Sequence, residues 1–135
     1  EKNPFELNKS YYFKNKLDLK KMNVCANLLF NYVDFKSFSK SKSDVKTYNC
    51  KIFNATWEIV DSNLCFKIKA DRFLRNMVRA IVGTLIEVGL GTISKDDFEE
   101  IINKRDRKLA GYSVPPHGLY LKEINYNWDK ILVNG

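Results

Sequence analysis

The sequence is poor in the residues that build metal centres and disulfide frameworks. Among 135 residues there is one histidine, His117, and there are three cysteines, Cys25, Cys50 and Cys65. The cysteines are widely spaced, odd in number and not arranged as a CxxC pair, so neither a zinc site nor a set of disulfides is indicated. A lone histidine in a loop after two prolines is a poor candidate for metal binding or acid–base work. We therefore expect reduced, buried cysteines and no metal.

The sequence also lacks a long apolar run. No uninterrupted apolar stretch approaches the length that a membrane-spanning helix needs. Residues 1–5 show no basic start followed by an apolar stretch, so no secretory signal is seen. With 44% hydrophobic and 29% charged residues, the composition is ordinary for a globular protein. We expect a single domain over residues 1–135, a cytoplasmic location and no membrane partner.

Acidic residues are the scarcer of the two charged classes. Against 23 Lys and Arg there are 16 Asp and Glu, which gives a formal net charge of +7. Such an excess favours a polyanionic partner, nucleic acid in particular. Many lysine-rich proteins simply have a well-solvated surface, so the placement of the charges has to decide.

Hydrophobic periodicity and capping residues predict three helices. The first is expected to begin after an N-cap at Asp18 and to end near Phe30. A longer apolar helix is expected over residues 71–88, followed by glycines that can end it. A short helix is expected after Ser94 and Asp97, which have the spacing of a capping box.

Alternating patterns predict the strands. Residues 51–60 and 64–70 alternate apolar and polar side chains around a turn and indicate an antiparallel hairpin, and residues 118–126 indicate a last strand. The order of elements favours an α+β fold in which helices pack on one face of an antiparallel sheet. The remaining segments are expected to lack regular structure: an extended lead-in at 1–16, an exposed serine- and lysine-rich loop at 37–43 and a tail at 127–135.

The segment 70–83, Ala-Asp-Arg-Phe-Leu-Arg-Asn-Met-Val-Arg-Ala-Ile-Val-Gly, carries most of the functional information. If this segment is helical, Arg72, Arg75, Asn76 and Arg79 share the side opposite to the apolar one. Arginine suits bidentate contact with phosphate or carboxylate, so the stripe is a candidate for RNA binding. An ordinary solvent face with internal salt bridges explains the stripe equally well.

Several pieces of the sequence, in order and at matching separations, resemble the C-terminal half of the tRNA pseudouridine synthase A family. The resemblance covers nearly the whole chain, and its most specific part is the arginine segment. The pieces are Asn3-Pro4-Phe5, Asp34-Phe35-Lys36-Ser37-Phe38, residues 70–85, Lys104-Arg105-Asp106-Arg107, Ala110-Gly111 and Gly118-Leu119-Tyr120-Leu121.

The resemblance implies an isomerase that converts uridine to pseudouridine at positions 38–40 of the tRNA anticodon stem-loop. It implies tRNA as partner, no cofactor, and a homodimer for the intact enzyme. The family pattern makes Arg79 the basic partner of the catalytic aspartate and Leu119 a pocket-lining residue. The enzyme also needs a basic surface that holds the RNA backbone, and the stripe of Arg72, Arg75 and Asn76 is expected to supply it. The aspartate of the family lies in an Arg-Thr-Asp-Ala-Gly loop of the N-terminal half, and this sequence contains no such loop. We therefore expect the chain alone to be one half of a synthase and inactive.

Two other classes of function fit the same residues. One is a non-catalytic RNA-binding module with a basic helix. The other is an interaction domain whose arginines pair with acidic residues of a partner protein. An Arg-Thr-Asp loop in the coding sequence upstream would favour the synthase over both.

Overall fold

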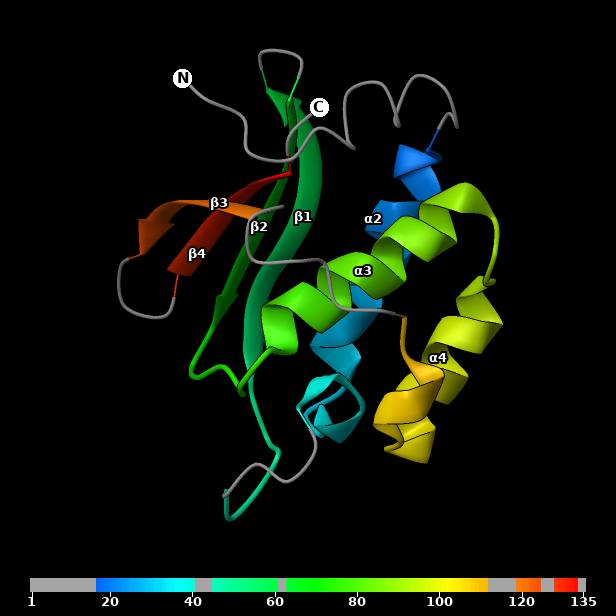
Figure 1. Cartoon of the computed structure of the whole chain (residues 1–135), viewed down its shortest axis with the longest axis vertical. Helices are drawn as coiled ribbons and strands as arrows, with labels where there is room; N and C mark the ends of the chain where they lie inside the picture. Colours follow the sequence, from blue (N-terminus) through cyan, green and yellow to red (C-terminus); the bar gives the residue numbers. More distant parts are fainter. Residues whose placement is uncertain (1–16, 41–44, 61–62, 112–118, 125–127, 134–135) are drawn as a thin grey trace.

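A computed structural model describes residues 17–40, 45–60, 63–111, 119–124 and 128–133. It confirms the expected α+β fold, with the three helices on one face of a four-stranded antiparallel sheet (Figure 1). The sheet has the order β1-β2-β4-β3. The helices are α2 (Leu19–Leu28), α3 (Met77–Leu90) and α4 (Lys95–Lys104), and the strands are β1 (Ile52–Val60), β2 (Asn63–Ala70), β3 (Leu119–Ile124) and β4 (Trp128–Val133). Three 3₁₀ turns complete the list: η1 (Leu29–Asn31), η2 (Lys36–Phe38) and η3 (Arg107–Leu109).

Helix α2 begins as its N-cap predicts and closes one edge of the sheet. Asp18 accepts a hydrogen bond from the backbone N–H of Lys21 at 3.0 Å. One turn further, the side-chain amide of Asn23 accepts from the backbone N–H of Trp57 at 2.7 Å and donates to the carbonyl of Trp57 at 3.0 Å. Because β1 lies at the end of the described sheet, its outward backbone groups have no strand partner there. Asn23 thus replaces the missing strand and fixes α2 against β1.

Helix α3 runs through the centre of the core. Ten of its fourteen residues are buried, from Met77 to Gly89. Gly89 lies inside the helix, where a Cβ atom would come within 2.5 Å of the sulfur of Met22. Gly91 ends the helix in a left-handed conformation with φ 84°, as expected for a helix C-terminus.

The long helix begins later than its apolar periodicity predicts. Residues 71–76 are not helical, and α3 starts at Met77 after Asn76, which has a left-handed φ of 69°. The reason is a pair of hydrogen bonds that holds Asp71 against Lys51, the residue before β1. Asp71 accepts from the backbone N–H of Lys51 at 2.8 Å and donates its own N–H to the carbonyl of Lys51 at 3.0 Å. The prediction of one helical arginine stripe is therefore wrong, because Arg72 and Arg75 precede the helix.

Two segments expected to lack structure are ordered. The region expected to be a tail contains β4, which pairs with both β2 and β3. The loop expected to be exposed begins with the buried residues Ser37, Phe38 and Ser39, and the Ser37 hydroxyl donates to the carbonyl of Ile101 in α4 at 2.6 Å. The expected lead-in at 1–16 lies outside the described residues, as does His117.

None of the helices in the described part of the chain is long and apolar enough to span a membrane.

Candidate functional site

Arg72 holds the chain segment that leads into β1. Its Nη1 atom donates to the carbonyls of Thr47 at 3.1 Å and Asn49 at 3.0 Å. On the opposite edge of the same extended segment, the carbonyl of Tyr48 accepts from the backbone N–H of Phe35 at 3.0 Å. The guanidinium of Arg72 therefore has a structural partner on the protein, which the sequence-based assignment to RNA binding did not foresee.

Arg75 and Asn76 lie in the turn between β2 and α3. The side chain of Arg75 is exposed, and its carbonyl accepts from the backbone N–H of Lys40 at 3.0 Å. Asn76 is half-buried and serves as the N-cap residue of α3, with its carbonyl accepting from the N–H of Ala80 at 3.1 Å. A positive φ at this position is tolerated by asparagine better than by most residues, so Asn76 has a backbone role of its own.

Arg79 lies in the first turn of α3 and is half-buried. The next residue, Ala80, accepts a hydrogen bond from the hydroxyl of Thr84 at 2.7 Å, and that hydroxyl accepts from the backbone N–H of Gly111 at 2.8 Å. The helix turn that carries Arg79 is thus tied to the chain at Gly111. Arg79 is no part of a continuous stripe with Arg72, because the turn at Asn76 separates them.

Leu119 opens β3, where its backbone pairs with that of Val133 in β4. Its side chain lies outside the described part of the structure, as does Gly118. Whether Leu119 lines a pocket with Arg79 therefore stays a prediction.

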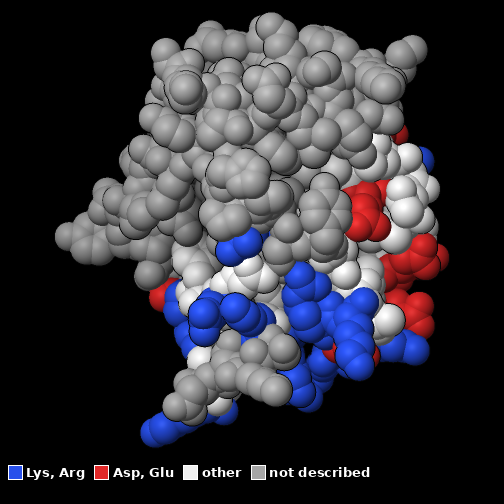
Figure 2. Space-filling model, in the orientation of Figure 1, with Lys and Arg blue, Asp and Glu red and all other residues white. Residues whose placement is uncertain are grey.

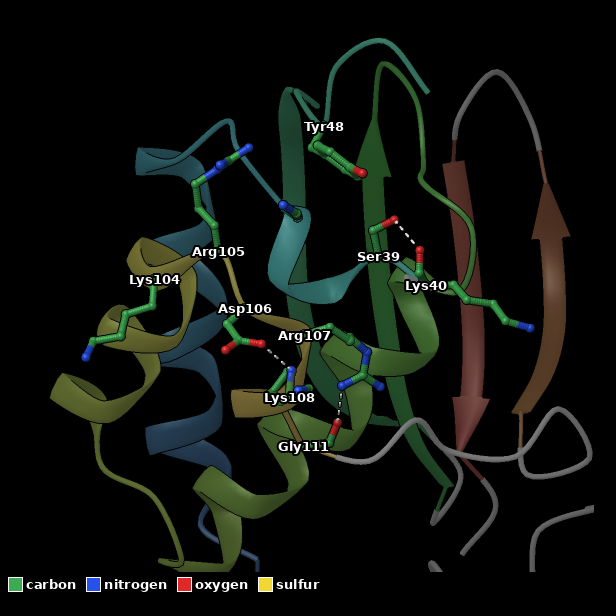
Figure 3. A pocket seen from close by; sticks show the side chains of 11 residues that line it. Ser39, Lys40, Tyr48, Lys104, Arg105, Asp106, Arg107, Lys108 and Gly111 are labelled. Carbon is green, nitrogen blue, oxygen red and sulfur yellow. Dashed lines mark hydrogen bonds between the residues drawn. The ribbon is translucent and has the colours of Figure 1, made fainter. Parts of the chain in front are cut away.

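A basic groove of about 840 Å³ lies between residues 36–40 with Tyr48 on one side and residues 104–111 on the other (Figure 3). We call it the basic groove, and its lining is dominated by cations. Of the residues that the structure describes, six Lys and Arg residues and one carboxylate, Asp106, contribute to it. Figure 2 shows Lys and Arg side chains gathered over this part of the molecular face. The cations are Lys36, Lys40, Lys104, Arg105, Arg107 and Lys108, and the other lining residues are Ser39, Tyr48, Ala110 and Gly111.

Contacts within the protein orient several of these cations. Arg105 forms an ion pair with Asp34 at 2.5 Å, and Arg107 donates to the carbonyl of Gly111 at 3.1 Å. The ammonium of Lys36 lies 5.7 Å from the centre of the Tyr48 ring. The groove surface is therefore positively charged, and its guanidinium groups are oriented by the protein before any partner binds.

Sequence reasoning did not single out this groove. The run Lys104-Arg105-Asp106-Arg107-Lys108 was its available signal, since four cations stand among five residues. Lys36 and Lys40 are 64 or more positions away from that run and join it only through the fold.

The cysteines do not form a reactive centre. All three are free and buried, as expected. Burial, which is the largest effect, raises the pKa of the Cys50 thiol from 9.0 to about 11, against the opposing effect of Arg72. Burial also raises the pKa of Cys25. Within the described residues, no cluster of three or more His, Cys, Asp or Glu side chains has a geometry that could hold a metal ion.

A family described as tRNA pseudouridine synthase matches residues 32–127. The chain belongs to this family. The matched range contains the Arg79 segment, the basic groove and β3. The sequence-based resemblance is thereby confirmed.

Curated relatives named tRNA pseudouridine synthase A support the same family. The protein of Bacteroides fragilis is 52% identical over 124 residues, which cover 91% of this chain and 49% of that protein. The protein of Parabacteroides distasonis is 49% identical over 126 residues, which cover 93% of this chain and 50% of that protein. The protein of Bacillus subtilis is 36% identical over 129 residues, which cover 94% of this chain and 52% of that protein. The chain thus spans about half the length of the curated synthases it matches.

Proposed function

We propose that this chain is the part of a tRNA pseudouridine synthase that supplies the arginine side of the active site and part of the RNA-binding surface. The observation that carries the proposal is the half-buried Arg79 on the first turn of α3, within a family-matched segment and tied through Thr84 to the chain that leads towards β3. The substrate would be a uridine of the tRNA anticodon stem-loop. The product is pseudouridine, in which the same base is attached to the ribose through carbon.

The reaction breaks the bond between the ribose and the base nitrogen, and then forms a bond between the ribose and a base carbon. The hydrogen on that base carbon leaves to solvent as a proton and the freed ring nitrogen takes up a proton, so atoms and electrons balance and the isomerisation needs no oxidant, reductant or group donor. The target base has to leave the stack before a protein group can reach it. We propose that Arg79 and Leu119 line the pocket that receives this base.

The role of Arg79 in this proposal is electrostatic. A carboxylate that lies beside a guanidinium is favoured in its charged form and is oriented by paired hydrogen bonds. We place the catalytic aspartate outside these 135 residues, because no Arg-Thr-Asp-Ala-Gly loop occurs in the sequence. The chain alone would then bind tRNA weakly and convert no uridine.

A tritium-release assay on tRNA labelled at carbon 5 of uridine tests the proposal. We expect release with the full-length protein and none with the purified 135-residue chain. Tritium release by the isolated chain would show that the catalytic residue lies within these 135 residues, against the proposal. Tight tRNA binding by the full-length protein without any release would instead favour the second candidate, a non-catalytic RNA-binding module, which the excess of basic residues also supports.

Two wider properties belong to the same proposal. The intact synthase is expected to be a homodimer, which sedimentation equilibrium of the full-length protein tests. The protein is expected in the cytoplasm, where fractionation of the source cells would find it together with tRNA.

A further inference from the structure

We propose that the basic groove is a docking site for the phosphate backbone of the RNA substrate, and that it acts in binding and not in the chemical step. The inference rests on the proposed function, because it takes tRNA as the partner. It moves the main RNA contact away from Arg72, whose guanidinium bonds the carbonyls of Thr47 and Asn49, to cations that the sequence analysis did not assign to RNA binding.

The charge balance of the groove favours a polyanion. Among the described residues, six cations and one carboxylate line it, and two of the cations, Lys104 and Arg105, have ion pairs, with Glu100 and Asp34. The pair of Lys104 and Glu100 is mostly exposed, at 58% and 61% of the side-chain surface, and is 3.4 Å long. Such a pair contributes little to stability, so Lys104 can exchange its partner for a phosphate at small cost.

The shape of the groove favours a strand over a single small anion. Its volume of about 840 Å³ is within the range of a site for a ligand of several groups, and exceeds what one phosphate fills. The cations come from two parts of the chain and are spread along the groove, with Lys40 at one side, Lys104 at the other, and Arg107 and Lys108 between them (Figure 3). Successive phosphates of one strand can contact both sides at once.

The groove is also fixed in relation to Arg79. Lys40 is joined to the turn before α3 by the hydrogen bond from its N–H to the carbonyl of Arg75. Gly111, at the other side, is joined to α3 by its bond to Thr84. A strand held in the groove therefore has a set register relative to the first turn of α3, which is what a site for one flipped base requires.

The test compares two triple variants of the full-length protein with the same loss of charge. The groove variant carries Lys40→Gln, Lys104→Gln and Lys108→Gln, all at exposed positions. The control variant carries Lys20→Gln, Lys21→Gln and Lys95→Gln, which are exposed at the starts of α2 and α4 and do not line the basic groove. The dissociation constant for unmodified tRNA is measured for each variant over a series of salt concentrations.

We expect the groove variant to bind tRNA at least about tenfold more weakly than the control variant. The slope of log affinity against log salt concentration should be smaller in magnitude by about two to three, because each of the three lost phosphate contacts removes about 0.7 to 0.9 from that slope. At saturating tRNA its rate of pseudouridine formation should equal that of the control. Equal affinities and slopes for the two variants would overturn the inference, and so would a slower chemical step in the groove variant alone.

Two competitors distinguish the source of the anion. Inorganic phosphate and poly-glutamate, each at matched ionic strength, should displace tRNA no better than chloride does. Displacement by phosphate that the groove variant abolishes would make the groove a free-phosphate site, and the same result with poly-glutamate would make it a site for an acidic protein. The binding measurements do not need catalysis, so an inactive unmodified protein would count against the proposed function while the groove is judged by affinity alone.

Discussion

The backbone N–H of Gly111 donates to the hydroxyl of Thr84 over 2.8 Å, and this bond fixes the end of the basic groove on α3. The close approach depends on glycine. A Cβ atom at position 111 would lie 2.7 Å from a carboxylate oxygen of Glu87 and 3.0 Å from the Cα atom of Thr84. Because the hydroxyl also donates to Ala80, one turn of α3 connects the groove to the position after Arg79.

Thr84→Val should lower the free energy of unfolding of the full-length protein by about 1 to 3 kcal/mol, since the buried N–H of Gly111 loses its acceptor while the shape of the side chain is kept. Thr84→Ser keeps the hydroxyl and should recover most of the loss. Urea denaturation of both variants measures the difference. If Val and Ser destabilise equally, the hydroxyl does not hold the loop.

Asn23→Leu should destabilise by about 1 to 3 kcal/mol, because it leaves both the N–H and the carbonyl of Trp57 without a partner at the sheet edge. Asn27 lies on the same helix and is exposed. Asn27→Leu should therefore change stability by less than about 0.5 kcal/mol. Thermal unfolding of the two variants checks the prediction, and similar melting temperatures would contradict it.

Arg72 and Arg75 should separate stability from binding. Arg72→Ala removes the donor to two carbonyls and should cost about 1 to 2 kcal/mol of stability. Arg75→Ala, at an exposed side chain, should leave stability within about 0.5 kcal/mol and weaken tRNA binding in a salt-dependent way. Denaturation and filter binding of both variants are the measurements. A stability loss confined to Arg75→Ala would reverse this assignment.

Cys50 should be protected from alkylation in the folded protein. With its pKa raised from 9.0 to about 11, the folded protein holds about a hundredfold less thiolate below pH 9 than the unfolded chain does. Stability should also fall as pH rises from about 9 to about 11, because the unfolded thiol ionises first in that window. Iodoacetamide labelling read by peptide mass spectrometry tests the first part, and rapid native labelling of Cys50 at pH 8 would contradict it.

The fold was largely predictable because its signals are local. Asp18 and Ser94 cap helices where their spacing indicated, and Ser94 forms the expected capping box with Asp97. The hairpin of β1 and β2 follows from the alternation of apolar and polar residues, apart from a register shift between Ile52 and Asn54. The start of α3 was missed because apolar periodicity continues through residues 71–76, whereas hydrogen bonds to Lys51 and the positive φ of Asn76 determine their backbone. Those bonds join residues 20 positions apart and leave no local pattern.

The site was predictable only in part for the same physical reason. Arg79 was proposed from a contiguous segment with a strong family resemblance, and its role stays a prediction. Lys40 and Lys104 are 64 positions apart in the sequence. The packing of η2 on α4 brings them together in the basic groove. Arg72 was assigned to RNA binding from its residue type, and only the tertiary structure showed the carbonyls that it bonds.

The central claim is that Arg79 acts on the chemical step of a uridine isomerisation. Arg79→Ala in the full-length protein should leave the protein folded while it removes the charge that orients the catalytic carboxylate. The rate of the chemical step should fall roughly a hundredfold or more, as for other preorganised electrostatic contacts. Arg79→Lys should recover only part of the rate, because lysine keeps the charge but loses the planar fork.

Single-turnover kinetics with enzyme saturating over tRNA measures that step directly. Arg75→Ala serves as the matched control, since it also removes one arginine charge, from the turn just before α3. We expect Arg79→Ala to be slow at every tRNA concentration and Arg75→Ala to reach the normal rate at saturation. A normal single-turnover rate for Arg79→Ala at saturation would contradict the account and leave Arg79 as a contact for RNA phosphate.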